Sequence, residues 1–313
     1  MSEPLLSLRH VRVQYGRFLA VDDLSFDLRG GELLGLIGPN GAGKTTTLRA
    51  ATGLQPISTG HVTVLGHDVF EHATEVGQHL ALAPDTPALY DALKVDEYLE
   101  FIARCYGLPR GLTSERIDHW LEQLWLSEKR RERVGSLSRG MKQRLAVART
   151  LLPDPHVVLM DEPAAGLDPA GRVQFRRLLA SLRDQGKALI VSSHILADLS
   201  EVCTHIAMME HGRLRSFGTV AEVAGGSNRQ RSRYRIMLVQ RVGDVATRLA
   251  DVAGITEIEA DGDLVTLEYD EGRAAAARLL AALLTAGLPV AEFGPERPDL
   301  EQAYLRSGIK QVD

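Results

Sequence analysis

The residues best suited to chemistry lie in one glycine-rich loop, which reads GPNGAGKT over residues 38–45. The loop follows an apolar run typical of a strand and precedes a run typical of a helix from Thr46 on. Glycines let successive backbone N–H groups point at phosphate oxygens, and a helix N-terminus adds partial positive charge. In this pattern Lys44 reaches the β- and γ-phosphates of a nucleotide, and the Thr45 hydroxyl binds Mg²⁺. The predicted nucleotide contacts are Gly38, Pro39, Asn40, Gly41, Ala42, Gly43, Lys44, Thr45 and Thr46.

Two carboxylates follow a second apolar run. Residues 157–160 read VVLM, and Asp161 and Glu162 come directly after them. Open α/β sheets bind ligands at the carboxyl ends of their strands, so this position suits a site. Asp161 offers the hard oxygens that Mg²⁺ prefers, directly or through water. Glu162 is placed to orient or deprotonate an attacking water.

A third segment lies between these two and reads LSRGMKQR over residues 137–144. Ser138 is well placed as the N-cap of a helix that we expect from Gly140 to Leu152. A serine hydroxyl, a glycine N–H and a helix N-terminus together form an anion site. Taken alone, the segment is an ordinary capped helix start.

The elements that must position these loops follow from the order of the apolar segments. From residue 33 to residue 209 short apolar strands alternate with helical runs, which predicts an α/β domain with a mostly parallel sheet. Two earlier strands are predicted at residues 5–15 and 19–28. Residues 86–150 predict a helical subdomain, including an amphipathic helix from Thr113 to Trp125. We expect Trp120 and Trp125 in its core, with a contact surface as the alternative.

The chain becomes glycine-rich and then arginine-rich at residues 225–233, which we expect to be a linker. Residues 1–224 would form the first domain and residues 234–313 a small second one. The second domain is predicted to follow the order strand, helix, strand, strand, helix, strand, typical of ferredoxin-like α+β domains. It shows no set of chemically reactive residues, so we expect a structural or regulatory role. The arginines suit a solvated linker; docking on a partner or on lipid head groups is the alternative.

The composition limits the class of protein. The chain has 313 residues, of which 44% are hydrophobic and 25% charged, which is ordinary for a soluble protein of one or two domains. The formal net charge of −5 argues against a nucleic-acid partner. Two distant cysteines indicate a reducing compartment without a disulfide framework. No run reaches the ~18 apolar residues of a membrane span, and no signal peptide is visible, so another chain would supply any membrane part.

Together the motifs resemble the nucleotide-binding subunits of ATP-binding cassette (ABC) transporters, over roughly residues 5–223. The resemblance rests on six motifs in the family's order: an aromatic residue before the second strand (Tyr15), the Walker A loop (38–45), the signature (137–143), Walker B (157–162), the D-loop (165–168) and a switch histidine (His194). The form of the signature and the small C-terminal domain resemble the exporter-type, ABC-2-like ATPase subunits. The resemblance also implies that the two early strands form an N-terminal antiparallel β-subdomain.

The resemblance implies roles for single residues. Tyr15 would stack on adenine; a strand-edge tyrosine is the alternative. The catalytic residues would be Lys44, Glu162 and His194. Contacts to an ATP held by a second, head-to-tail subunit would come from Ser138, Arg139, Gly140, Met141 and Asp168. The Mg²⁺ ligands would be Thr45, Asp161 and Asp85.

Asp85 departs from the family pattern. The family usually has Pro-Gln or Pro-Glu at this motif, whereas this chain has Pro84-Asp85. The aspartate is shorter and anionic, so it can bind Mg²⁺ or a water but extends less far toward the attacking water.

The resemblance also implies partners. We expect an ATPase that binds ATP and Mg²⁺, pairs with a second ATPase subunit as a homodimer, and docks an integral membrane permease around residues 85–98 at the cytoplasmic face of the membrane. A soluble cassette ATPase acting on ribosomes or nucleic acid is the main alternative, disfavoured by the single cassette without long heptads. A P-loop kinase is disfavoured by the signature and the D-loop.

Overall fold

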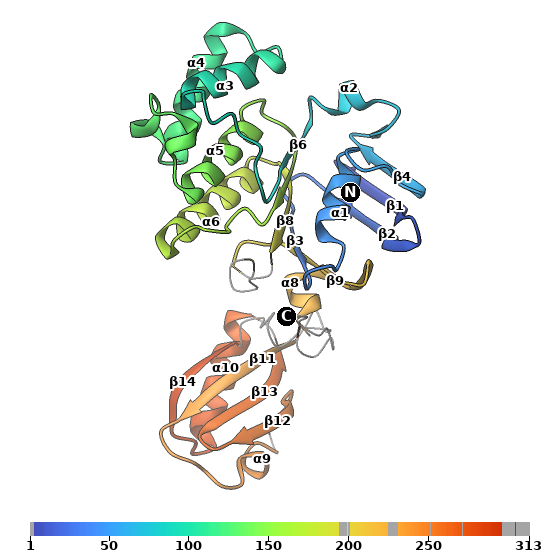
Figure 1. Ribbon diagram of the computed structural model, residues 1–313. Coiled ribbons are helices and arrows are strands. Elements are labelled where there is room, and N and C mark those ends of the chain that lie inside the picture. Colours follow the sequence, from blue (N-terminus) through green and yellow to red (C-terminus); the bar gives the residue numbers. More distant parts are fainter. Residues whose placement is uncertain are drawn as a thin grey trace. The chain divides into compact units, whose positions relative to one another are not determined.

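The computed structural model describes residues 3–193, 199, 201–224, 231–250, 252–270, 272–295 and 304. The chain forms two compact units, Met1–Thr219 with Tyr304–Asp313, and Val220–Ala303 (Figure 1). The linker expected at residues 225–233 falls mostly outside the described ranges, so the domain limits stay a prediction. Within the described ranges, each helix is too short or too polar to cross a lipid bilayer.

An antiparallel sheet opens the first unit. Its strands are β1 (Leu6–Tyr15), β2 (Phe18–Leu28), β4 (Thr59–Val64) and β5 (His67–Asp68), in the order β2-β1-β4-β5. Alternate residues of β1 and β2 are buried, as expected of a sheet with one face on the core. The predicted β-subdomain is therefore present, with β5 as a strand that the sequence pattern did not predict.

The second sheet of this unit carries the loops of interest. Its strands are β3 (Leu33–Ile37), β6 (Leu80–Ala83), β7 (Val157–Asp161), β8 (Ala188–Ser193), β9 (His205–Glu210) and β10 (Arg213–Thr219), in the order β10-β9-β3-β8-β7-β6. All neighbours pair in parallel except β9 and β10. Every residue of β3, β7 and β8 is buried, because both faces of a parallel sheet are covered. The predicted mostly parallel sheet is confirmed.

In the described part of the first unit, the helices are α1 (Lys44–Ala51), α2 (Ala73–Val76), α3 (Val95–Cys105), α4 (Arg110–Gln123), α5 (Arg139–Leu151) and α6 (Pro169–Asp184), with single 3₁₀ turns at Ser127–Lys129 and Val134–Ser136. Helices α3 and α4 lie side by side in the predicted helical subdomain, which is a helical insertion in the α/β domain at residues 86–150 (Figure 1).

Two local predictions in this insertion were wrong. Helix α4 begins at Arg110 rather than Thr113, whose hydroxyl instead donates to the Pro109 carbonyl at 3.0 Å. Trp125 is not a core residue: it follows the end of α4 with φ of +54° and is 44% exposed. The Arg144 guanidinium lies 5.5 Å from its ring centroid, a cation–π contact. Trp120, within the helix, is buried as expected.

One hydrophobic core joins the antiparallel sheet, α1 and the parallel sheet. It includes Leu8 and Phe26 from the first sheet, Leu48 from α1, and Leu36 and Leu159 from the second. Apolar side chains of the two sheets and of α1 are buried against one another. This burial fixes α1, and with it the glycine-rich loop, against β3.

The second unit has its own core and sheet. Its elements are α8 (Val220–Val223), β11 (Arg231–Leu238), α9 (Val245–Arg248), β12 (Thr256–Asp261), β13 (Leu264–Asp270), α10 (Arg273–Thr285) and β14 (Val290–Pro295). The sheet order is β12-β13-β11-β14, with every pair antiparallel. The predicted β-α-β-β-α-β order is confirmed, with α9 only four residues long. The sequence pattern also predicts a helix over residues 299–306, which lies outside the described residues apart from Tyr304.

Candidate nucleotide-binding site

The neighbouring strands β3, β8 and β7 end at the same edge of the parallel sheet. In the ladder between β3 and β8, Ile37 pairs with Ser193, and in the ladder between β7 and β8, Asp161 pairs with Ser192. The glycine-rich loop after β3 and the carboxylates at the end of β7 are therefore brought together, as open α/β sheets require.

The loop is wedged between neighbouring backbone segments, which restricts its residue types. A Cβ on Gly38 would lie 2.4 Å from the Met209 carbonyl oxygen, and one on Gly43 would lie 2.6 Å from that of Ala20. Gly43 also has φ of +102°. Helix α1 begins directly after it without a side-chain cap, so its first N–H groups are open to an anion.

We expect Gly43→Ala to destabilise the protein more than Gly41→Ala. Both glycines have positive φ, which costs an alanine about 1–2 kcal/mol, but no atom lies within 4 Å of a Cβ on Gly41. The clash at Gly43 adds about 1–3 kcal/mol of overpacking. The midpoint of urea denaturation without nucleotide measures the difference. Equal midpoints for the two variants would contradict the crowding of the loop against Ala20.

Lys44 lies folded into the loop. Its Nζ donates to the carbonyl oxygens of Gly38 at 2.6 Å and Pro39 at 3.1 Å, and the residue is only 7% exposed. Burial lowers the pKa of Lys44, while the negative charges of Glu162 and then Asp161 act to raise it. The ammonium group is thus held inside the loop, close enough to interact electrostatically with Glu162, directly after β7, and with Asp161 at its end.

Asp161 is the centre of a small hydrogen-bond network. Its Oδ2 accepts from the Thr45 hydroxyl at 2.7 Å and its Oδ1 from the Ser192 hydroxyl at 2.5 Å, with the residue only 3% exposed. A carboxylate and a threonine hydroxyl in contact are a hard-oxygen donor set. This set fits Mg²⁺, which binds through few protein ligands and keeps several waters.

Ser192 also positions Glu162. Its Oγ accepts from the Glu162 backbone N–H at 2.9 Å, and Glu162 has φ of +45°, an uncommon conformation for a residue with a side chain. None of the sequence motifs singled out Ser192 for this bridging position. The pair of serines at the end of β8 is the sequence feature that could have indicated this bridge, but which residues they contact depends on the register between β7 and β8.

Tyr15 lies at the end of β1 with 45% of its surface exposed. Its hydroxyl donates to Oε1 of Gln55 at 2.8 Å, and the Gln55 backbone N–H donates to the Arg49 carbonyl of α1. The ring is therefore fixed at its tip and accessible. Phe18, across the hairpin and 63% exposed, is a second exposed aromatic side chain that the motif analysis did not single out.

The signature residues are joined to the D-loop of the same chain. Ser138 caps α5 as predicted, with its hydroxyl accepting from the Met141 N–H at 3.3 Å. A Cβ on Gly140 would lie 3.0 Å from the Gly166 carbonyl oxygen, so the helix start packs closely on that loop. Asp168 caps α6 by accepting from the Gly171 N–H at 2.9 Å.

The other predicted site residues that the structure describes are not joined to the glycine-rich loop. Among the described residues, no hydrogen bond or ion pair joins the glycine-rich loop and Thr46 to the signature residues 138–141. Asp85 is exposed on the loop after β6, and its Oδ1 accepts from the Thr86 N–H at 2.7 Å rather than meeting Thr45 or Asp161. His194 lies outside the described residues.

The fold and the site define an α/β nucleotide-binding protein of the P-loop class. A protein-family model described as "ABC transporter" matches residues 21–165. Nod factor export ATP-binding protein I of Ralstonia nicotianae is 32% identical over 311 residues, 97% of this chain and 94% of the relative. Linearmycin resistance ATP-binding protein LnrL of Bacillus subtilis is 29% identical over 307 residues, 96% of this chain and 97% of the relative. A solved ATP-binding subunit of an ABC transporter matches with a TM-score of 0.66 and 28% identity, over 70% of this chain and 91% of that one.

The chain therefore belongs to the family of ABC transporter ATP-binding proteins. Its molecular role is that of an ATP-binding subunit, as the motifs predicted, and this family assignment favours the transporter function over the ribosome or nucleic-acid alternative.

Proposed function

We propose that this protein hydrolyses ATP to power export through a separate membrane permease, with two copies closing around two ATP molecules. The observation that carries the proposal is the Thr45–Asp161–Ser192 network, which joins the glycine-rich loop to the carboxylates of β7. Relatives named for Nod factor export and linearmycin resistance support export as the direction.

Each residue around the triphosphate has a role of its own. Lys44 would exchange its two carbonyl partners for phosphate oxygens, and Thr45 and Asp161 would hold Mg²⁺, with Asp85 as a further ligand to the ion or to a water. When bound, the ion would neutralise charge on the phosphates. Glu162 accepts a proton from the attacking water, and its bent backbone is held by Ser192.

A second copy completes the site. Ser138 is exposed at the N-terminal end of α5, and Gly140, two residues further on, packs closely on the D-loop of its own chain. We propose that residues 138–141 contact the γ-phosphate held by the partner and that Asp168 lies at the same interface. Tyr15 stacks on adenine, and His194 contacts the γ-phosphate.

The helical insertion offers a surface for the permease. Tyr90 is 56% exposed and Phe101 42% exposed, with their ring centroids 5.5 Å apart in an edge-to-face arrangement. Exposed aromatic pairs are typical of protein interfaces. We propose that residues 85–98, with Phe101, dock the permease and hold the subunit at the cytoplasmic face of the membrane.

We expect Ser138→Asp to abolish ATP-driven dimerisation without loss of folding stability. Aspartate caps a helix as well as serine does, but its charge would face the partner's phosphates. The measurement is sedimentation velocity with ATP, together with the melting temperature. All proteins compared also carry Glu162→Gln, the substitution expected to slow hydrolysis, so that ATP persists during the run.

Ser138→Ala is the matched control, because it loses the cap, at a cost of about 1 kcal/mol, and adds no charge. It should melt earlier than Ser138→Asp yet still dimerise with ATP. If Ser138→Asp dimerises as well as the unsubstituted chain, Ser138 does not face a nucleotide across an interface, and the two-copy arrangement is wrong.

A further inference from the structure

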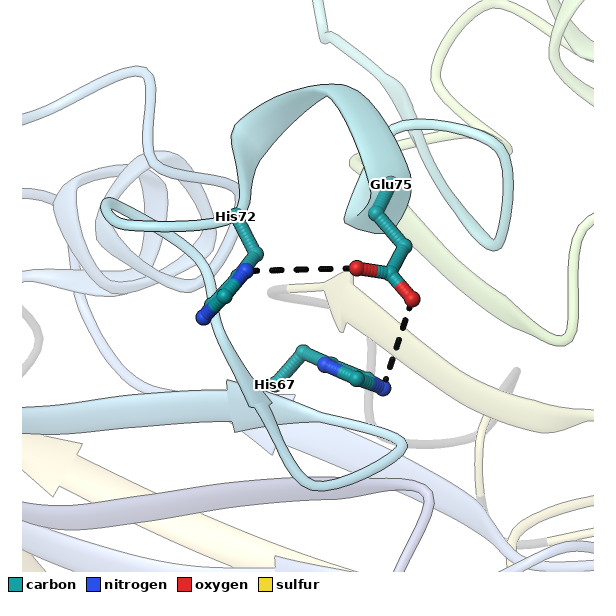
Figure 2. Close-up of side chains that lie close together, drawn as sticks. All are labelled: His67, His72 and Glu75. Atoms are coloured by element: carbon teal, nitrogen blue, oxygen red, sulfur yellow. Dashed lines mark ion pairs between the residues drawn. The ribbon is translucent and has the colours of Figure 1, made fainter.

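Two histidines and a glutamate form a cluster on the β5–α2 segment, outside the nucleotide site. Figure 2 shows His67 from β5, His72 at the N-cap of α2 and Glu75 from α2, with one carboxylate oxygen directed at each ring. His67 Nε2 lies 3.5 Å from Glu75 Oε1, and His72 Nδ1 lies 3.9 Å from Glu75 Oε2. One ligand atom of each residue lies within 4.8 Å of the others, a spacing that no other such trio reaches in the part of the chain described.

The backbone that carries the cluster is held in place independently of it. The His72 N–H donates to the Asp68 carbonyl at 2.9 Å, and Oδ1 of Asp68 accepts from the Phe70 N–H at 2.8 Å. Val69 and Val76 are buried in the core shared by the two sheets. The turn is therefore anchored from beneath, while the three polar side chains stay on the accessible side.

We propose that His67, His72 and Glu75 bind a borderline divalent transition-metal ion, with Zn²⁺ as the representative. Imidazole and carboxylate are the ligands of such ions, whereas Mg²⁺ prefers oxygen alone. Tetrahedral Zn²⁺ with bonds of about 2.0–2.2 Å places its ligand atoms about 3.4 Å apart. The His67–Glu75 pair, at 3.5 Å, already meets this spacing. The side chains are half exposed, so rotation about their χ angles can bring the His72 ring within the same distance. Water takes the open coordination position.

The ion would have a mechanical effect on this part of the fold. Helix α2 has only four residues, too few for a stable helix in isolation, and its one buried side chain is Val76. Coordination by His67 in β5 and by His72 and Glu75 ties α2 to the sheet edge. Amide hydrogen exchange in residues 72–79 should therefore slow when Zn²⁺ is added.

The same distances also suit simple surface ion pairs, which contribute about 0–1 kcal/mol and bind no metal. Calorimetric titration of the tag-free, nucleotide-free protein with Zn²⁺, in excess Mg²⁺ at neutral pH, distinguishes a metal site from such ion pairs. We expect one Zn²⁺ per chain. His67→Ala and Glu75→Gln should each weaken binding at least about tenfold, since loss of even an outer partner of a metal site has that effect.

Two further variants make the titration specific. His10→Ala removes a histidine of another surface pair, with Asp23 at 2.8 Å, and should leave Zn²⁺ binding unchanged. His79→Ala tests the rival site, where the Nδ1 atoms of His79 and His156 lie 3.2 Å apart. The proposal is overturned by the absence of stoichiometric binding, by full binding in His67→Ala, by loss of binding in His79→Ala, or by unchanged hydrogen exchange in residues 72–79.

Discussion

Replacing Glu162 by glutamine is expected to slow ATP hydrolysis by about 10²–10⁴-fold, the usual contribution of a general base. Glutamine keeps the shape of glutamate but cannot accept the proton of the attacking water. ATP binding should persist, because the Thr45–Asp161 contact and the backbone bond to Ser192 involve no side-chain atom of Glu162. Phosphate release measures hydrolysis, and sedimentation with ATP should show a trapped dimer.

Glu115→Gln is the matched control, because it makes the same change at an exposed position of α4. It should hydrolyse ATP at the unsubstituted rate. A Glu162→Gln protein that hydrolyses ATP at that same rate would remove Glu162 from the mechanism. One that fails to bind ATP would show that the carboxylate serves binding rather than proton transfer.

The second large effect is expected from Lys44→Ala, which should weaken ATP binding by at least about a hundredfold. Two charge-assisted hydrogen bonds to phosphate at about 1.5–3 kcal/mol each account for this loss. The lysine is buried inside the loop, where its partners are two backbone carbonyl oxygens, so its removal takes positive charge away from the phosphate position. Titration with a fluorescent ATP analogue gives the affinity.

Lys187→Ala controls for the loss of a largely buried lysine. Lys187 Nζ pairs with Asp154 Oδ1 at 2.6 Å, next to the start of β8 and away from the loop end of that strand. This variant should lose stability and keep ATP affinity. If Lys44→Ala binds ATP as tightly as the unsubstituted protein, the assignment of the glycine-rich loop to phosphate binding fails.

The sequence by itself determined the features that depend on neighbouring residues. Glycine spacing before a helix predicted the loop at residues 38–45, because only glycine tolerates the close backbone contacts found at Gly38 and Gly43. Ser138 was predicted as a cap because capping is decided within one helical turn. The period of apolar residues predicted the parallel sheet and the β-α-β-β-α-β order of the second unit.

Only the tertiary structure decided which distant residues meet. Ser192 bridges Asp161 and Glu162 because parallel strands β7 and β8 are in a register that pairs Asp161 with Ser192, and no local pattern encodes that register. Trp125 is exposed because the chain leaves α4 with a positive φ, although its apolar spacing continued the helix. The approach of His67 to Glu75 likewise arises from a short strand and a single helical turn whose packing on the core, rather than their propensity, holds them in place.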